Sequence, residues 1–253
     1  MNRIKDYKSL AVDMVGWLCK YTHTNNINSF VVGVSGGIDS AVASTLAVKT
    51  GKPTYLVGMP LNQNKEQETL SDAHMYWLSS MYPNVKILKA DLSESYAKLM
   101  SDLTSEVGVE YTGNPMAKAN TKSRLRMVTL YHVAANVGGI VVGTGNKVED
   151  YGVGFYTKYG DGGVDIAPIA DLYKSEVREL GRELGVITEI INATPTDGLW
   201  EDGRNDEDQI GASYEQLEEA METGAGPALE ILNRFNAQNK HKMDPIPTYK
   251  LEV

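Results

Sequence analysis

The sequence predicts an α/β protein whose open, doubly wound parallel sheet is flanked by helices. Short apolar runs rich in β-branched residues alternate with segments of helical composition, which is typical of buried parallel strands connected by helices. Right-handed crossovers then make the doubly wound order the default topology. The length of 253 residues suits one large domain, and we find no linker or internal repeat, so residues 1–253 are expected to form a single domain.

The predicted elements follow one another along the chain. Apolar residues recur at three- and four-residue steps from Ile4 to Leu18, which predicts an amphipathic first helix. The strands are expected at 30–34, 55–59, 85–88 and 139–143. The helices between them are expected at 41–48, 66–77, 93–100 and 115–136.

The second half of the chain begins with a Gly- and Tyr-rich segment, residues 144–165. A loop of this length without regular structure is usually functional or mobile. A helix is expected at 173–184, a polar irregular stretch at 195–209, and two closing helices at 214–221 and 227–239.

Composition excludes several classes of function. Twenty-four basic against thirty-three acidic residues give a net charge of −9, which argues against binding to nucleic acid or to anionic membranes. The single cysteine, Cys19, cannot form an internal disulfide. No apolar stretch approaches the ~18 residues of a membrane span, and no export signal is seen. We therefore expect a cytoplasmic protein that binds neither nucleic acid nor membrane.

The strongest local motif is Ser35-Gly36-Gly37-Ile38-Asp39-Ser40, where a buried strand gives way to a helix. Backbone N–H groups and the helix dipole favour an anion there. The glycines let the chain approach a phosphate closely, and the serines add hydroxyl donors. Asp39 would repel a phosphate unless a cation lay between them, which suggests Mg²⁺ and a triphosphate. The motif lacks the lysine of the common phosphate-binding NTPase loop.

The alternative is an ordinary strand-to-helix turn in which the glycines serve only steric needs and Asp39 caps the helix. That interpretation does not explain why two serines and two glycines gather around Asp39.

This motif after a hydrophobic strand resembles the pyrophosphate-binding loop of the adenine-nucleotide α-hydrolases, a superfamily that includes GMP synthetase, argininosuccinate synthetase and tRNA-modifying ligases. Three further segments resemble NAD synthetases in order and near-matching spacing: 120–127, 143–149 and 155–165. The tail with His241, Lys242, Pro245 and Pro247 is also similar. The resemblance extends from about Phe30 to the end of the chain.

The resemblance implies an activity. NAD synthetases activate the nicotinate carboxylate of deamido-NAD with ATP, releasing pyrophosphate, and ammonia then displaces AMP to form the amide. Some members carry a second, nitrilase-like domain that makes ammonia from glutamine with a catalytic cysteine. We expect this chain to have no such domain, with Cys19 in the core instead. Free ammonia, or ammonia from a separate donor, would then be the nitrogen source. Homodimers are expected, as in that family.

The resemblance also implies roles for individual residues. ATP would contact Gly33, Val34, Ser35, Gly36, Gly37, Ile38, Asp39, Ser40, Thr144, Lys174 and Thr196. Deamido-NAD would contact Arg124, Lys158, Asp165, His241 and Lys242. Mg²⁺ would be held by Asp39 and Glu149. Asp39, Lys174 and Asp165 would be catalytic, Asp165 as our hypothesis for the group that takes a proton from ammonium.

Each basic residue has a plainer interpretation from sequence alone. Arg124 would belong to a solvated helix face, Lys174 to an ion-paired helix surface, and His241 would be structural. Two other functions also stay open. One is a ligase of the same superfamily with a nucleotide or tRNA as acceptor, and the other is a nucleotide-binding sensor without catalysis.

Overall fold

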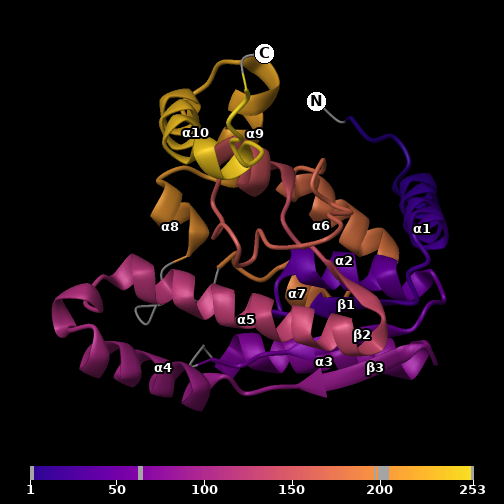
Figure 1. Cartoon of the computed structure of the whole chain (residues 1–253). Coiled ribbons are helices and arrows are strands. Elements are labelled where there is room, and N and C mark those ends of the chain that lie inside the picture. Colours follow the sequence, from indigo (N-terminus) through magenta and orange to yellow (C-terminus); the bar gives the residue numbers. More distant parts are fainter. Residues whose placement is uncertain (1–2, 62–64, 197, 199–204, 252–253) are drawn as a thin grey trace.

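The structure is a computed structural model that describes residues 3–61, 65–196, 198 and 205–251. Its centre is a parallel sheet in the order β3-β2-β1-β4 (Figure 1). The strands are β1 (Ser29–Gly33), β2 (Thr54–Gly58), β3 (Val85–Lys89) and β4 (Gly139–Val142). The predicted fold class and all four predicted strands are confirmed.

The helices connect and cover these strands. They are α1 (Tyr7–Thr24), α2 (Ile38–Lys49), α3 (Lys65–Met81), α4 (Ser93–Glu106), α5 (Pro115–Val137), α6 (Lys174–Leu184), α7 (Thr188–Ile191), α8 (Asp206–Ile210), α9 (Tyr214–Thr223) and α10 (Leu229–Met243). Two short turns complete the set, the 3₁₀ turn η1 (Val109–Tyr111) and the π-helical turn η2 (Val148–Val153).

Two helices lie where the sequence predicted none. The short α7 follows α6, and α8 lies at the end of the stretch 195–209, which we expected to be irregular. A capping box explains the start of α8, because Asn205 accepts from the Asp208 N–H at 2.7 Å while Asp208 caps the Asn205 N–H. Residues 197 and 199–204 of that stretch lie outside the described residues.

Alternation along the strands divides the core between the two faces of the sheet. Phe30 and Val32 of β1 pack with α1, α2, α3 and α6, whereas Val31 between them faces α5. β4 does the same, with Ile140 and Val142 on the first face and Val141 on the second. Helices therefore cover both faces, as the doubly wound class requires.

The last helices form a separate layer above the carboxyl ends of the strands (Figure 1). Helices α9 and α10 enclose a second apolar cluster against η2, built around Val148, Val153, Tyr214 and Leu217. This packing fixes η2 next to the loop that follows β1. Within the described residues, no helix combines the length and apolar character that crossing a membrane requires.

Candidate active site

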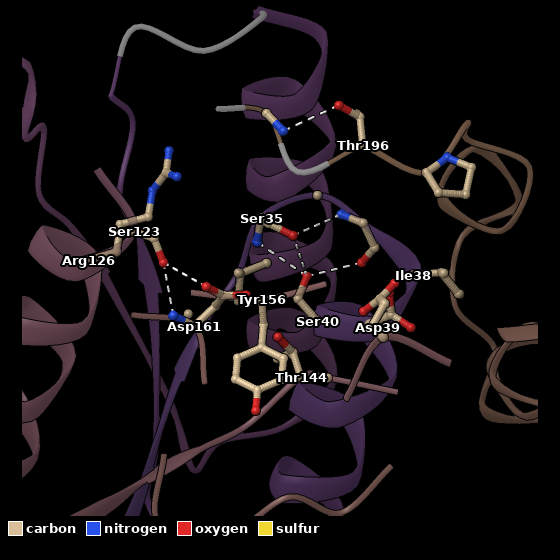
Figure 2. A pocket seen from close by; sticks show the side chains of 18 of the residues that line it. Ser35, Ile38, Asp39, Ser40, Ser123, Arg126, Thr144, Tyr156, Asp161 and Thr196 are labelled. Atoms are coloured by element: carbon tan, nitrogen blue, oxygen red, sulfur yellow. Dashed lines mark hydrogen bonds between the residues drawn. The ribbon is translucent and has the colours of Figure 1, made fainter. Parts of the chain in front are cut away.

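A cavity of about 490 Å³ opens at the carboxyl ends of β1 and β4. Ligands bind at this edge in open α/β sheets. The residues that we predicted to bind ATP all line it: Gly33, Val34, Ser35, Gly36, Gly37, Ile38, Asp39, Ser40, Thr144, Lys174 and Thr196. Figure 2 shows several of them together around this cavity.

The loop after β1 is held in a ligand-ready shape by its own serines. The Ser40 hydroxyl accepts from the Ser35 N–H at 3.2 Å and donates to the Gly37 carbonyl at 3.0 Å. Gly36 has φ +91°, and a Cβ there would lie 2.4 Å from the Gln67 carbonyl oxygen. The close approach of α3 therefore requires glycine at position 36.

The start of α2 leaves backbone donors for a ligand. Its N-cap is Gly37, which makes no side-chain capping bond. The interpretation of Asp39 as the helix cap is therefore wrong, because Asp39 lies in the first turn and pairs with another element. The N–H groups of the first turn of this 12-residue helix are suited to an anion.

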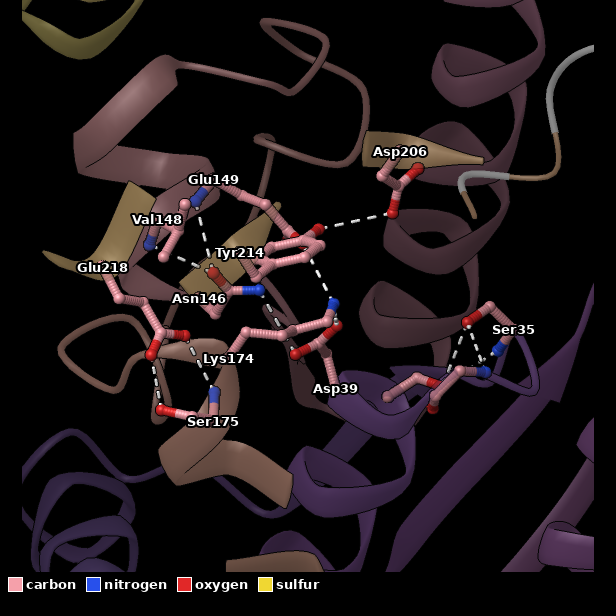
Figure 3. Close-up of polar contacts among 12 residues, drawn as sticks. Ser35, Asp39, Asn146, Val148, Glu149, Lys174, Ser175, Asp206, Tyr214 and Glu218 are labelled. Atoms are coloured by element: carbon pink, nitrogen blue, oxygen red, sulfur yellow. Dashed lines mark hydrogen bonds and ion pairs between the residues drawn. The ribbon is translucent and has the colours of Figure 1, made fainter. Parts of the chain in front are cut away.

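Lys174 joins two carboxylates in the wall of the cavity (Figure 3). Its ammonium forms a short ion pair with Asp39 and lies 3.0 Å from Glu149 Oε1. The side chain is only 3% exposed. Burial alone would lower the pKa of Lys174, but the two carboxylates outweigh it and raise that pKa, so the lysine stays protonated. The alternative of an exposed ion-paired surface lysine is wrong.

Asn146 connects Asp39 to the turn η2, and nothing in the sequence indicated this role. Its amide donates to Asp39 Oδ1 at 3.3 Å, and its carbonyl oxygen accepts from the N–H groups of Val148 and Glu149 at 3.1 and 3.2 Å. The Asn146 side chain thus links Asp39 to the first two N–H groups of η2. A π-helical turn is frequent at functional sites.

The carboxylates of Asp39 and Glu149 suit a divalent cation. Both contact one cationic atom, Lys174 Nζ, so the two can share a positive ion. Among the described residues, no group of three or more His, Cys, Asp or Glu side chains could hold a metal ion by itself. Mg²⁺ commonly uses one or two carboxylates and takes its other ligands from phosphates and water, so these two residues fit that ion.

The cavity is otherwise acidic. The described lining residues include Arg126 and Lys174 as cations, and their carboxylates are Asp39, Glu66, Glu149, Asp150, Asp161 and Asp206. Burial, reinforced by the charges of Glu149, Asp161 and Asp39, raises the pKa of Asp150 to about 8. Such a cavity favours an anion that arrives with its own counter-cations.

Four of the residues predicted to bind deamido-NAD meet outside the cavity lining. The Arg124 guanidinium donates to the Lys158 carbonyl at 3.3 Å, and the Lys158 ammonium donates to the His241 carbonyl at 3.0 Å. Lys242 donates to the carbonyls of Gly154 and Tyr156 at 2.6 and 2.8 Å. The structure therefore gathers Arg124, Lys158, His241 and Lys242 into one cluster, and their role stays a prediction.

Asp165 lies apart from both groups. Its Oδ1 accepts from the Tyr131 hydroxyl at 3.0 Å, and its Oδ2 accepts from the Val141 N–H at 2.8 Å. Asp165 is not among the residues that line the cavity. Its carboxylate thus closes the edge of β4, and the predicted role in accepting a proton from ammonium gains nothing from this placement.

Comparisons with known proteins agree on one family. The sequence model of a family described as NAD synthase matches residues 10–246. The NH(3)-dependent NAD(+) synthetase of Carboxydothermus hydrogenoformans is 40% identical over 233 residues, 90% of this chain and 92% of that protein.

Two solved structures extend this agreement to the fold. The chain resembles an NMN synthetase from Francisella tularensis with a TM-score of 0.89 and 33% identity, over 98% of this chain and 100% of the other. It resembles an NAD⁺ synthetase from Burkholderia pseudomallei with a TM-score of 0.76 and 26% identity, over 94% and 90% of the two chains.

The sheet order, the Ser35–Ser40 loop and the Lys174 cluster define an α/β ligase of the ATP pyrophosphatase class. Within that class, the chain belongs to the NAD synthase family. The resemblance inferred from the sequence is thereby confirmed.

Proposed function

We propose that this protein uses ATP and ammonia to convert deamido-NAD into NAD, releasing AMP and pyrophosphate. The observation that carries the proposal is the placement of Lys174, Asp39 and Glu149 in the wall of a cavity that the Ser35–Ser40 loop also lines. The names of several relatives, including that of Carboxydothermus hydrogenoformans, support the same reaction.

The first step is adenylation. A nicotinate carboxylate oxygen attacks the α-phosphorus of ATP, the bond from that phosphorus to the bridging oxygen breaks, and pyrophosphate leaves. A carboxylate is already ionised at neutral pH, so no base is needed. Backbone N–H groups at the start of α2 and the Lys174 ammonium would stabilise the charge that grows on the leaving phosphates.

The second step forms the amide. Ammonia attacks the acyl carbon of the mixed anhydride, and AMP leaves with the anhydride oxygen. Ammonium must lose a proton before it can attack, because it has no lone pair. Asp165 is our hypothesis for the acceptor of this proton, whereas Asp150 and Asp161 are carboxylates that line the cavity itself.

Mg²⁺ bound with ATP would screen the phosphate charge and hold the triphosphate in position. Asp39 and Glu149 are the residues that would hold it, since both already share a cation. With the cation on Asp39 and Glu149, the Lys174 ammonium would be released to contact the phosphates.

The volume of the cavity indicates which of the two substrates it holds. A cavity of about 490 Å³ suits one ligand of nucleotide size, and we assign it to ATP. Deamido-NAD would then extend toward the basic cluster of Arg124, Lys158 and Lys242, which lies outside that cavity.

A second candidate substrate is nicotinate mononucleotide. The likeness to the Francisella tularensis structure, named NMN synthetase, favours it, since that likeness has a TM-score of 0.89. Both substrates present the same carboxylate, so the chemistry is unchanged, and only the second nucleotide distinguishes them.

We also propose a cytoplasmic homodimer. Helix α4 contributes no buried residue within the described chain, and Figure 1 shows α4 and the start of α5 extending away from the sheet. Val109, Tyr111, Met116 and Val128 of this region are all more than half exposed. A second copy covering this apolar surface would remove it from water. Sedimentation equilibrium should give twice the mass of 27.7 kDa.

The test of activity is direct. Purified protein receives ATP, Mg²⁺ and ammonium with deamido-NAD or nicotinate mononucleotide, and the products are separated by chromatography. We expect equal amounts of amide, AMP and pyrophosphate, with deamido-NAD giving the higher kcat/KM. A higher value for nicotinate mononucleotide would assign the second candidate, and release of ADP and orthophosphate would contradict both.

Lys174→Met is the variant expected to abolish this activity, and Lys89→Met serves as its control. Lys89 also forms an ion pair with a carboxylate, but its side chain is 41% exposed on β3. A loss confined to Lys174→Met would tie the reaction to this cavity.

A further inference from the structure

Tyr214 contacts the carboxylate–lysine cluster from outside the cavity (Figure 3). The Tyr214 hydroxyl donates to Glu149 Oε1 at 2.6 Å, and the hydroxyl oxygen lies 3.4 Å from Asp206 Oδ2. Its ring centroid lies 4.8 Å from Lys174 Nζ. Tyr214 is 1% exposed and is not among the residues that line the cavity.

A single hydroxyl hydrogen can serve only one acceptor at full strength. The 2.6 Å distance assigns it to Glu149, because the 3.4 Å separation from Asp206 is long for a hydroxyl donor. The contact is charge-assisted and stronger than a neutral hydrogen bond.

The two contacts that hold the Glu149 carboxylate both involve the same oxygen atom. Lys174 and Tyr214 both reach Oε1, so the second oxygen, Oε2, takes no part in either contact. If Lys174 turns toward phosphates when ATP binds, Glu149 loses one tether and keeps the one from Tyr214.

The backbone fixes Tyr214 independently of the ligand. It is the first residue of α9, after a Ser213 N-cap with a capping box to Gln216. Its own N–H donates to Glu207 Oε1 at 3.0 Å, and its ring belongs to the apolar cluster under η2. The hydroxyl is therefore delivered from a rigid element.

We propose that Tyr214 is a positioning residue for the divalent cation that accompanies ATP. It would hold Glu149 through Oε1 and leave Oε2 available to the cation. This inference rests on the proposed function only in requiring that the cavity binds ATP with a divalent cation. Outer-shell partners of metal-binding carboxylates typically change metal affinity 10–100-fold.

The experiment compares ATP binding with and without Mg²⁺. ATP is titrated calorimetrically into wild type and Tyr214→Phe, once with Mg²⁺ and once with EDTA, and without a nicotinate substrate so that no turnover occurs. We expect the ratio of the Kd in EDTA to the Kd with Mg²⁺ to be 10–100-fold smaller in the variant than in wild type. The Kd in EDTA itself should change less than about twofold. Phenylalanine keeps the buried ring, and circular dichroism checks the fold.

Two comparisons sharpen the result. Tyr151→Phe removes the hydroxyl of a 60% exposed tyrosine on η2 and should keep the wild-type ratio. In a Glu149→Gln background, adding Tyr214→Phe should have little further effect, because Glu149 carries the coupling.

Each outcome is informative. An unchanged ratio in Tyr214→Phe, an equal weakening of both Kd values, or a wild type whose ATP affinity ignores Mg²⁺ would overturn the proposal. Failure of the amidation assay with the expected change in ratio would overturn the proposed reaction and leave the role of Tyr214 intact.

Discussion

Arg3 and Glu176 form a two-pronged ion pair between residues 173 positions apart in the sequence. Arg3 Nε lies 3.0 Å from Oε1 and Nη2 lies 2.7 Å from Oε2. Arg3 also donates to the Asp171 carbonyl at 2.8 Å, and its guanidinium lies 4.5 Å from the Tyr173 ring centroid. The amino-terminal segment is thus fastened to the turn that begins α6, directly before Lys174.

This pair should stabilise the start of α6. We expect Arg3→Ala to lower the free energy of unfolding by about 1–3 kcal/mol, because Glu176 is buried and would lose a charged donor. Arg3→Lys should recover less than half of it, since lysine cannot bind two oxygens in parallel. Urea unfolding measures both. Arg182→Ala, which breaks an exposed pair with Glu179, should cost less than about 0.5 kcal/mol. Equal effects at the two sites would contradict this.

The loop after β1 depends on a single glycine. Gly36→Ala should cost about 2–4 kcal/mol, because φ +91° strains any L side chain and the new Cβ would lie 2.4 Å from the Gln67 carbonyl. Gly16→Ala is a matched control in helix α1, where a Cβ would meet nothing within 4 Å. It should stabilise the protein by roughly 0.5–1 kcal/mol. Opposite signs in thermal unfolding are the expected pattern.

Lys174 balances charge as well as contacting ATP in our proposal. Lys174→Met should lower stability by about 3–5 kcal/mol at neutral pH, because Asp39 and Glu149 would face each other without their shared cation. The loss should shrink at low pH, where a carboxylate takes up a proton instead. Denaturant midpoints at several pH values measure this. Lys89→Met, which breaks an exposed ion pair on β3, should change the free energy of unfolding by less than about 1 kcal/mol throughout.

His74 makes stability depend on pH. It is fully buried, its Nε2 lies 2.9 Å from Ser44 Oγ, and burial lowers its pKa from 6.5 to about 4. Well above pH 6.5 His74 is neutral in both the folded and the unfolded state, so it does not make the free energy of unfolding depend on pH. As the pH falls from 6.5 to 4 the unfolded state binds a proton that the folded state refuses, which removes about 3 kcal/mol.

His74→Gln tests that dependence. The variant should lose this contribution between pH 6.5 and 4, so that its free energy of unfolding falls less steeply with acid than that of wild type. His132→Gln, on the exposed side of α5, should keep the wild-type slope. Parallel curves for wild type and His74→Gln would show that another group is responsible.

Asp165 offers a choice between two roles. Its carboxylate accepts from Tyr131 and from the Val141 N–H, and asparagine can offer only one oxygen to those two donors. We expect Asp165→Asn to lower the melting temperature by several degrees, a loss of about 1–3 kcal/mol. The pH profile of ammonia-dependent turnover should keep its shape. A profile displaced in this variant would support Asp165 as the proton acceptor.

Local patterns were enough for the sheet and for the loop that follows β1. The β-branched runs and the Ser-Gly-Gly-Ile-Asp-Ser motif are each only a few residues long. Burial of the apolar runs determines the strands, and the conformation of the glycines determines the loop. Helix α8 was missed because its capping box lies in a polar stretch without apolar periodicity.

Tertiary structure decided what surrounds the loop. The resemblance pointed to Lys174 as an ATP-binding residue, but its own sequence context suited a helix-surface lysine equally well. Only the packing of α6 against α2 brings it to Asp39, 135 residues away. The same holds for Tyr214 and Asn146, whose roles arise from the packing of α9 and η2 rather than from any short motif. Local interactions determine which helices and strands form. Long-range packing determines which ionised side chains come into contact, and the residues next to them in the sequence do not indicate it.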